Sequence, residues 1–485
     1  MIRTLLPVKF FIFLASTLLC GAAGAQLRLP FVIGSNMVLQ HGRPLPVWGY
    51  AAAGERVTVQ FKGQIKTAVT DAAGQWRLQL DSLAVSAQPA DMLITAKNSS
   101  IRLSNILVGE VWLCSGQSNM EFSMAKSGKF EKVLNTRLPA PENELDKADN
   151  PLIRIFLVRN DYSKPHPRRH TWDTAAGTPL RDFSAPGYYF AKELYKQLQV
   201  PIGIISASIS GSRIEPWMPP SKSDTSKSDD SETGKFYVTM IRPLAPFALR
   251  GFLWYQGESN CFLNDTVHYA NKMETLIKSW RGLWSNNKMP FYYVQLAPFY
   301  YSRSKDGRPH TEQTLAEFRE QQFIVMNSIP YTGMIVTTDL NDKLDDIHPT
   351  YKWEIGRRLA LLALAKDYQE KVEYSGPRLR TINTKGNSIG LGFGHADDGL
   401  VSIDGKPLDW FEISGDNNDN LFLPAHALIK GNTLIVSAPG IAHPRAVRFA
   451  WNEAAQPNLF NKEGLPAIPF NTLECKGVTK EANKK

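Results

Sequence analysis

The sequence predicts an α/β protein whose central parallel sheet is covered by helices on both faces, with a β-rich region before and after it. Two observations support this fold class. Between residues 106 and 365, short apolar runs typical of buried parallel strands alternate with helix-like stretches. Before and after this part of the chain, short segments alternate apolar and polar residues and are separated by turn residues, as in antiparallel sheets.

The first 25 residues have the pattern of an export signal. Arg3 and Lys9 supply the positive start, and the apolar stretch that follows is too short to span a bilayer. Ala23-Gly24-Ala25 matches an A-x-A cleavage site. Cys20 would suit a lipoprotein signal, but the preceding Leu19 is bulky where a small residue is expected. We therefore expect simple cleavage and a periplasmic or secreted protein.

Composition and charge narrow the possible classes of function. The chain has 485 residues and a formal charge of +9, spread along the sequence without a long basic run. Nucleic-acid binding is therefore not supported. The cysteines that remain after cleavage, Cys114, Cys261 and Cys475, are too few for a disulfide framework and form no C-x-x-C pair for zinc. About 460 mature residues suggest roughly three domains.

Residues 26–105 are expected to form an N-terminal β-sandwich domain. The segments 57–61, 76–80 and 92–96 alternate apolar and polar side chains, and turn sequences rich in alanine and glycine separate them. Short strands at this spacing are typical of a small sandwich.

Residues 106–365 are expected to form the α/β domain. Its expected strands share runs of apolar residues and lie at 106–108, 111–114, 202–205, 252–255, 291–294 and 333–336. Its expected helices lie at 187–198, 271–284, 315–327 and 351–364. In a parallel sheet of this kind, ligands bind at the carboxyl ends of the strands.

The rest of the chain is expected to form a C-terminal β-rich domain over residues 366–477 and a disordered tail over 478–485. Strand-like segments occur at 388–393, 433–436 and 446–450. After the export signal, no segment is apolar over the length that a transmembrane helix requires.

Ser118 is the candidate nucleophile. The expected strand at 111–114 ends in Ser115-Gly116-Gln117-Ser118-Asn119-Met120. A small-residue turn between a strand and a helix presents a serine beside backbone N–H groups that can hold a developing oxyanion. Met120 stands where G-x-S-x-G has its second glycine, so the α/β-hydrolase motif is not matched. A buried turn without a catalytic role is the alternative.

His348 is the candidate general base. It follows Asp345-Asp346-Ile347 and precedes the expected helix at 351–364. A carboxylate two or three residues before a histidine can accept a hydrogen bond from Nδ1 and leave Nε2 free to take a proton. A surface histidine in a capping loop is the alternative.

Two turns after apolar strands carry candidate oxyanion donors. In the turn at 208–213, Gly211 would expose a backbone N–H, and in the turn at 256–260 the side-chain amide of Asn260 could donate. Glycine and asparagine also serve ordinary turns. Ser259 is a rival nucleophile, but the adjacent carboxylate of Glu258 would disfavour a serine alkoxide.

Taken together, these motifs resemble the four sequence blocks of the SGNH, or GDSL-like, hydrolase superfamily: 116–120, Gly211, 257–260 and 345–349. The residues of these blocks are most similar to those of the sialate O-acetylesterase branch. Further segments that resemble this branch are 35–40, 214–218, 254–260 and 458–466. The resemblance covers nearly the whole mature chain.

The resemblance implies a flavodoxin-like parallel sheet, with Ser118 as nucleophile and His348 as base. The acid that orients the histidine would be Asp345 on the superfamily spacing, or Asp346 as in many members of this branch, and a backbone carbonyl can also serve. The backbone N–H of Ser118, together with Gly211 and Asn260, would form the oxyanion hole.

Three further residues are candidate substrate contacts: Gln117, Glu258 and Arg213, the last as a partner for a sialate carboxylate. The implied reaction removes O-acetyl groups from sialic acids through an acyl-enzyme and needs neither a metal nor a cofactor. The implied partner is O-acetylated sialic acid or a sialoglycan, and not nucleic acid or, in the mature form, a membrane. Another acetylated glycan such as xylan is the alternative substrate. A non-catalytic glycan-binding protein is the alternative function.

Overall fold

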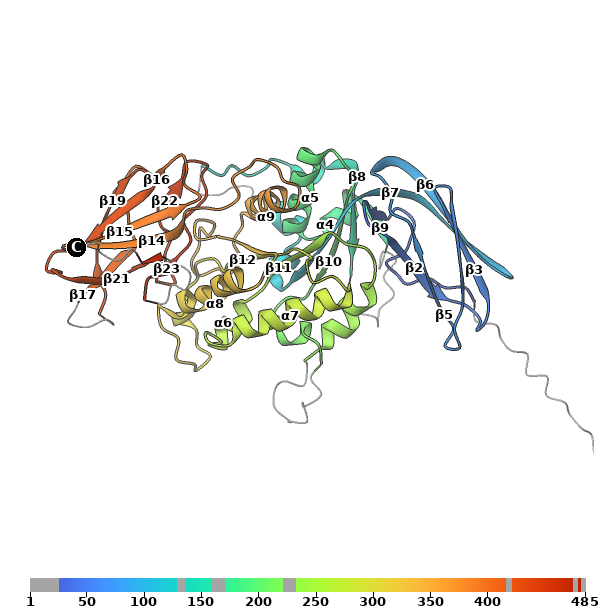
Figure 1. The fold of residues 1–485 in the computed structure, drawn as a ribbon, viewed down its shortest axis with the longest axis horizontal. Helices are drawn as coiled ribbons and strands as arrows, with labels where there is room; N and C mark the ends of the chain where they lie inside the picture. The colour runs from blue at the N-terminus through green and yellow to red at the C-terminus, as the bar shows by residue number, and fades with distance from the viewer. Residues whose placement is uncertain are drawn as a thin grey trace, which may run out of the picture.

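Three parts of the chain lie in a row in the computed structural model, with the α/β domain between two β domains (Figure 1). The structure describes residues 26–128, 137–158, 171–220, 233–415, 421–473 and 479–480. The expected export signal with Cys20, and Cys475, lie outside the described residues. Of the expected tail, residues 479–480 form strand β24, and the others lie outside the described residues.

The N-terminal domain is built from two sheets that share an apolar core. Strands β2 and β5 form one sheet, and β1, β3, β4 and β6 join the first part of β7 in the other. The buried alternate residues of these strands, such as Val47, Val59 and Trp76, pack together between them. The bounds are β1 Val38–Gln40, β2 Leu45–Tyr50, β3 Arg56–Phe61, β4 Gln64–Val69, β5 Gln75–Leu80 and β6 Ser86–Ala96.

Strand β7 (Ser99–Gly116) runs from this domain into the centre of the α/β domain. Its first part pairs with β6, and its last part pairs in parallel with β10 and β11. The domain boundary expected after residue 105 therefore falls inside one continuous strand.

The central sheet has the doubly wound order expected of a flavodoxin-like fold. Its strands lie in the order β13-β12-β11-β7-β10-β8-β9. Numbered among themselves along the chain, the five strands β10, β7, β11, β12 and β13 read 2-1-3-4-5. Strand β8 extends this sheet in parallel beside β10, and β9 pairs antiparallel with β8 at the edge. The bounds are β8 Asp149–Leu157, β9 Trp172–Ala176, β10 Ile202–Ser208, β11 Gly251–Tyr255, β12 Phe291–Val294 and β13 Thr332–Ile335. The predicted fold class is confirmed.

Helices cover both faces of this sheet, as the sequence pattern predicts. Helices α5 and α9 pack on one face, and α7 and α8 pack on the other (Figure 1). The bounds are α5 Ala185–Leu198, α7 Tyr269–Leu283, α8 Thr314–Ser328 and α9 Lys352–Asp367. Shorter helices are α1 Ser118–Glu121, α2 Met124–Ser127, α3 Glu144–Lys147, α4 Gly177–Arg181 and α6 Glu258–Phe262. Among the residues that the structure describes, no helix combines the length and apolarity needed to cross a membrane.

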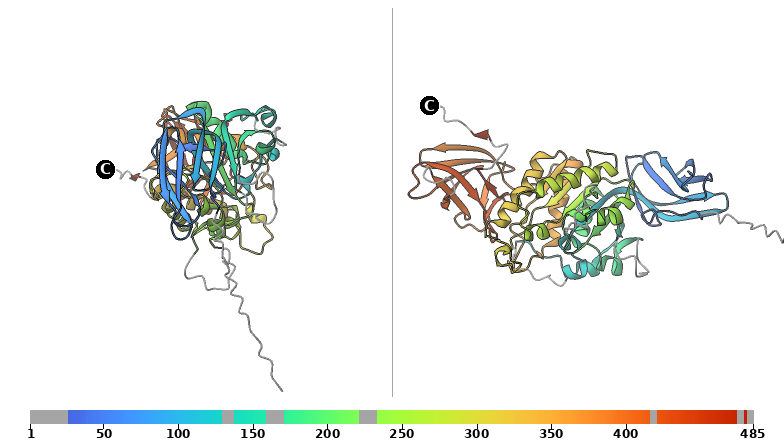
Figure 2. Two further views of the ribbon diagram at one scale, coloured as in Figure 1. Left: turned by 90° about the vertical axis from the view of Figure 1, so that its right-hand side faces the viewer. Right: turned by 90° about the horizontal axis from the view of Figure 1, so that it is seen from below.

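The C-terminal domain is a second β domain, at the opposite end of the molecule from the first (Figure 2), and its strands pair antiparallel except for β14 with β24. One sheet has the order β19-β20-β15-β14-β24, another has the order β18-β17-β21-β23, and β16 pairs with β22. The bounds are β14 Arg378–Lys385, β15 Ser388–Gly394, β16 Leu400–Ser402, β17 Phe411–Gly415, β18 Leu423–Pro424, β19 His426–Lys430, β20 Thr433–Ser437, β21 Pro444–Phe449, β22 Leu459–Asn461, β23 Phe470–Asn471 and β24 Thr479–Lys480.

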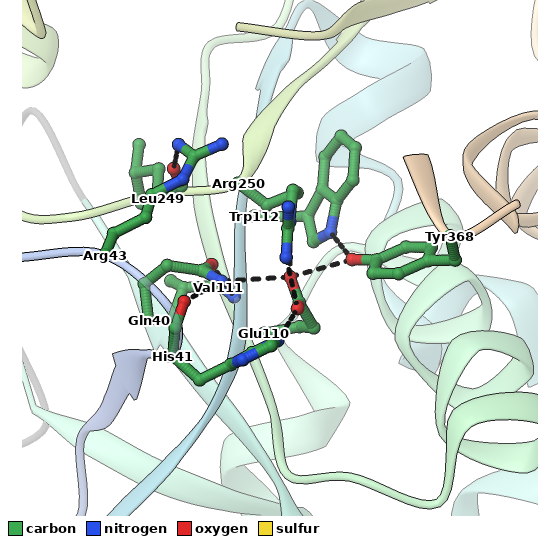
Figure 3. A network of polar contacts seen from close by, with 9 residues as sticks. All are labelled: Gln40, His41, Arg43, Glu110, Val111, Trp112, Leu249, Arg250 and Tyr368. Carbon is green, nitrogen blue, oxygen red and sulfur yellow. Dashed lines mark hydrogen bonds and ion pairs between the residues drawn. The ribbon is translucent and has the colours of Figure 1, made fainter. Parts of the chain in front are cut away.

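A buried carboxylate, Glu110 of β7, joins several segments where the N-terminal domain meets the central sheet (Figure 3). Arg250 donates two hydrogen bonds to it, at 2.7 and 2.8 Å, and Tyr368 donates one at 2.8 Å. His41 and Gln40, which precede β2, also contact Glu110. Burial raises the pKa of Glu110, but hydrogen bonds and charges from Arg250 and His41 outweigh it and lower that pKa to about 2.

Candidate active site

The candidate site lies at the carboxyl ends of the neighbouring strands β7, β10 and β11. Ser118 begins α1 directly after β7, and the turn with Gly211 follows β10. The strand order reverses around β7, and in doubly wound sheets such a switch point opens a crevice in which ligands bind. Strand pairing thus brings together motifs that lie far apart in the sequence.

Gly116 allows β7 and β11 to meet closely just before Ser118. Its φ is 142°, and a Cβ at this position would lie 2.1 Å from the carbonyl oxygen of Tyr255 in β11. The next N–H, that of Gln117, donates to the same carbonyl at 3.0 Å. The backbone conformation before the serine therefore requires glycine.

Ser118 and His348 face each other. His348 Nε2 lies 3.0 Å from Ser118 Oγ, within the range for proton transfer from a nucleophile to a base. His348 Nδ1 lies 3.3 Å from Asp346 Oδ1, and the same oxygen accepts the backbone N–H of His348 at 2.9 Å. Asn341 supports this loop by donating to the carbonyl of Asp346 at 3.0 Å.

Asp346 rather than Asp345 lies against the histidine, which corrects the assignment from the superfamily spacing. Asp345 points away: its carboxylate pairs with Arg303 at 3.1 Å, and its side chain is 80% exposed. The reason is local, because the N–H of Asp346 bonds to the carbonyl of Lys343 in a turn, and this turn directs successive side chains apart.

The surroundings of His348 favour its neutral form. Burial lowers the pKa of His348, and the positive charge of Lys352 lowers it further. Asp346 acts in the opposite direction, through its charge and its hydrogen bond, and Lys126 adds to the lowering. A base that stays unprotonated near neutral pH can accept the serine proton.

Asn260 does not occupy the position expected of an oxyanion donor. The residue is fully buried, and its amide nitrogen donates to Asp265 at 3.1 Å and to Glu215 at 3.3 Å. Its oxygen accepts from Gln256 and from the N–H of Ile214. The structure therefore corrects this assignment, because a neighbouring carboxylate cluster already uses the amide.

Gly211 lies in an exposed turn beside α1, and its role as an oxyanion donor stays a prediction. Glu121 of α1 accepts two hydrogen bonds from Ser210, both 2.6 Å long, and so ties this turn to the helix that carries Ser118. Among the described residues, no hydrogen bond occupies the N–H of Gly211. The rival serine, Ser259, donates its hydroxyl to the carbonyl of Gly211 at 3.0 Å. His348 contacts Ser118 instead, which favours Ser118 as the nucleophile.

The three candidate substrate contacts lie in different environments. Glu258 is fully buried and accepts a hydrogen bond from Asn119, so it lies beneath the site and does not reach a substrate, contrary to expectation. The side-chain oxygen of Gln117 accepts from the amide of Gln256 and from the N–H of Ser259, both at 3.2 Å. Arg213 is half-buried in the turn after β10.

Asn119 and Lys352 are buried beside this site, although Asn119 was noted only as part of the 116–120 block without a role of its own, and Lys352 lies outside every sequence motif. Lys352 donates to Asn119 Oδ1 at 2.6 Å. A signal for Lys352 was available, because it begins α9, and a cation is disfavoured at the N-terminal end of a helix. Within the described ranges, no group of three or more His, Cys, Asp or Glu side chains is arranged to hold a metal ion.

Comparison with known proteins relates the chain to sugar acetylesterases. A family model described as carbohydrate esterase, sialic acid-specific acetylesterase, matches residues 108–365. The chain is 29% identical to human sialate O-acetylesterase over 497 residues, covering 93% of both chains. It is 28% identical to the rat sialate O-acetylesterase over 546 residues, covering 96% of this chain and 97% of the other.

A solved structure is similar over the same extent. The carbohydrate acetylesterase from Xanthomonas citri is 33% identical to this chain and superposes with a TM-score of 0.81. The match covers 92% of this chain and 99% of the Xanthomonas chain, so it includes both β domains.

Proposed function

Because the chain belongs to the sialic acid-specific acetylesterase family of carbohydrate esterases, we propose that it removes O-acetyl groups from sialic acids with Ser118 as the nucleophile. The protein is a carboxylic ester hydrolase, and the family and the solved relative support deacetylation of a sugar. The observation that carries the proposal is the hydrogen-bonded series from Ser118 Oγ through His348 to Asp346.

In the first half of the proposed reaction, His348 Nε2 takes the Ser118 proton as Oγ bonds to the acetyl carbon. The bond from that carbon to the sugar oxygen then breaks, and His348 gives its proton to the leaving sugar hydroxyl. In the second half, water adds to the acetyl-serine with His348 again as base. Acetate leaves, and the proton returns to Ser118.

The oxyanion would be held by the backbone N–H groups of Ser118 and Gly211. Gln117 replaces Asn260 as the candidate for a third donor, since its side-chain oxygen is already held and its amide nitrogen is the remaining end of a side chain next to Ser118. Each such donor contributes about 3 kcal/mol to lowering the barrier.

Ser118→Ala is expected to abolish hydrolysis of 4-nitrophenyl acetate and labelling by a fluorophosphonate serine probe while the fold is retained. Loss of the attacking oxygen removes the covalent route. Ser259→Ala is the comparison variant, because it removes the rival serine and is expected to leave labelling intact. Labelling of Ser118→Ala at wild-type level would refute the assignment.

The sugar is tested separately from the chemistry. Acetate release is measured from O-acetylated N-acetylneuraminic acid and from acetylated xylan, with Ser118→Ala as the blank. Faster release from the sialic acid supports the proposed substrate. Faster release from xylan would retain the esterase and reject the sialic acid specificity.

A further inference from the structure

Asn119 joins four segments beneath the candidate site. Its amide nitrogen donates to the carboxylate of Glu258 in α6 and, at 3.0 Å, to the carbonyl of Ile347. Its oxygen accepts from Lys352 of α9. Asn119 follows Ser118 in α1, and Ile347 precedes His348, so one side chain connects the neighbours of the two reacting residues. Asn119 is only 1% exposed.

Lys352 is a buried cation whose ammonium group donates to a neutral amide. The group bonds to Asn119 and lies 4.7 Å from the ring centre of Phe122 and 5.3 Å from that of Tyr255. Burial lowers the pKa of Lys352 to about 7, against the opposing charges of Glu258 and Asp346. A buried ammonium is costly unless it is paired, so its position beside the site points to a role beyond stability.

Glu258 supplies the opposite charge on the other side of Asn119. One of its oxygens accepts from Asn119, and the other has no hydrogen-bond partner among the described residues. Burial raises the pKa of Glu258, while Asn119 and Lys352 act to lower it. Glu258, Asn119 and Lys352 thus form a short polar chain, sealed from solvent, behind Ser118 and His348.

We propose that Asn119 and Lys352 are positioning residues for the esterase reaction: Asn119 fixes the distance between Ser118 and His348, and Lys352 keeps His348 unprotonated. This inference rests on the proposed function, because it assigns His348 as the base. Asn119 acts on His348 through one hydrogen bond, which it donates to the carbonyl of Ile347, the residue before His348.

His348 is surrounded by charges from three directions. Asp346 of its own loop favours the protonated ring, whereas Lys352 of α9 and Lys126 of α2 disfavour it. Ser118 of α1 is uncharged and is hydrogen-bonded to Nε2. Lys126 is exposed and its effect is screened, whereas the charge of Lys352 acts through a buried, weakly polarisable region. Lys352 is therefore the cation whose removal changes His348 most.

Lys352→Met tests the electrostatic part. Without the cation the protonated ring is less disfavoured, so the acidic limb of kcat/KM is expected to move to higher pH by about one unit. NMR titration of the His348 ring in Ser118→Ala and in Ser118→Ala/Lys352→Met should show the same displacement without any substrate. Lys366→Met, an exposed lysine at the far end of α9, is the matched control.

Asn119→Ala tests the geometric part. Its kcat is expected to fall about 100-fold with KM changed by less than about threefold, because the reacting pair is no longer held in register. Asn461→Ala is the matched control: Asn461 is also fully buried with three hydrogen bonds, but it lies in the C-terminal domain. It is expected to lose stability without this loss of kcat.

The outcomes separate the two proposals. Wild-type protein that hydrolyses no acetyl ester would overturn the proposed function. An active wild type whose acidic limb and His348 titration shift no more in Lys352→Met than in Lys366→Met would overturn the role of Lys352 alone. Equal kcat in the Asn119→Ala and Asn461→Ala variants would overturn the role of Asn119. If Asn119→Ala does not fold, the Lys352→Met titration still decides the electrostatic part.

Discussion

The adjacent residues Asp345 and Asp346 have opposite environments although their chemistry is identical. Asp346 contacts both the ring and the backbone of His348, while Asp345 pairs with the exposed Arg303. Arg303 in turn lies over the ring of Tyr300, at 3.5 Å from the ring centre. This pair of aspartates therefore provides an internal comparison within one loop.

We expect Asp346→Asn to lower kcat/KM by about 10- to 100-fold, since the ring loses the acceptor that fixes its tautomer and stabilises its protonated form. The loss is smaller than for a buried acid because the side chain of Asp346 is 46% exposed. Asp345→Asn should keep nearly full activity. Steady-state kinetics with a chromogenic acetyl ester measure both variants, and equal losses would contradict the assignment of Asp346.

Several site residues could be read from the sequence, and others could not. Ser118, His348 and Gly211 lie in recognisable turns, and the structure gathers them at one edge of the sheet. The prediction for Asn260 was wrong because an asparagine motif does not reveal that Glu215 and Asp265 already use its amide. Such competition depends on residues that only folding brings near.

At the level of elements, the approach of β7 to β11 sets the position of the serine. Tyr255 pairs with Gly116, and the carbonyl of Tyr255 accepts the N–H of Gln117. The position of Ser118 is therefore set by the pairing of β7 with β11 as well as by the turn in which it lies. His348, by contrast, lies in the loop before α9, where hydrogen bonds from Asn341 and Asn119 to the backbone of this loop support it.

Gly116→Ala is expected to destabilise the protein by more than about 3 kcal/mol, because the new Cβ would meet a backbone carbonyl that cannot rotate away. Gly282→Ala is the matched control. Gly282 is exposed in α7, and a methyl group added there would meet no atom within 4 Å, so alanine should stabilise by about 0.5–1 kcal/mol. Thermal unfolding midpoints measure both, and equal midpoints would contradict this account of the strand contact.

At the level of the whole molecule, the N-terminal domain and the central domain are joined by a shared strand and a shared carboxylate. Strand β7 belongs to both, and Glu110 on that strand binds segments from before β2, before β11 and after α9. These contacts lie near the ends of the strands opposite to Ser118. These contacts stabilise the sheet that carries the site, and none of them involves the residues around Ser118.

Glu110→Gln is expected to lower stability by about 3 kcal/mol at pH 7, the value of a pKa held near 2 instead of its ordinary 4.5. A carboxyl group with a lowered folded-state pKa stabilises fully above its unfolded pKa. This stabilisation is lost as the pH falls from about 5 to about 2, so the difference from wild type should shrink in acid.

Thermal midpoints at pH 7 and pH 3.5 measure this effect. Asp81→Asn is the control, because Asp81 pairs with Lys66 on an exposed surface, and such pairs contribute less than about 1 kcal/mol. A difference between Glu110→Gln and wild type that stays constant across this pH range would contradict the role given to the carboxylate.

Local patterns along the chain were enough to predict the fold class, the five parallel strands β7, β10, β11, β12 and β13, the four long helices of the central domain, and the motifs that carry the serine and the histidine, but they missed β8 and β9. These features depend on hydrophobic periodicity and on short turn sequences, both of which can be recognised within a short stretch of the chain. Folding was needed to establish which aspartate meets His348, that Asn260 and Glu258 are sealed away, and that Asn119 connects to Lys352. It also placed the two β domains at opposite ends of the molecule. The physical reason is that burial and hydrogen-bond competition are properties of residues brought together from distant segments, and no local pattern records them.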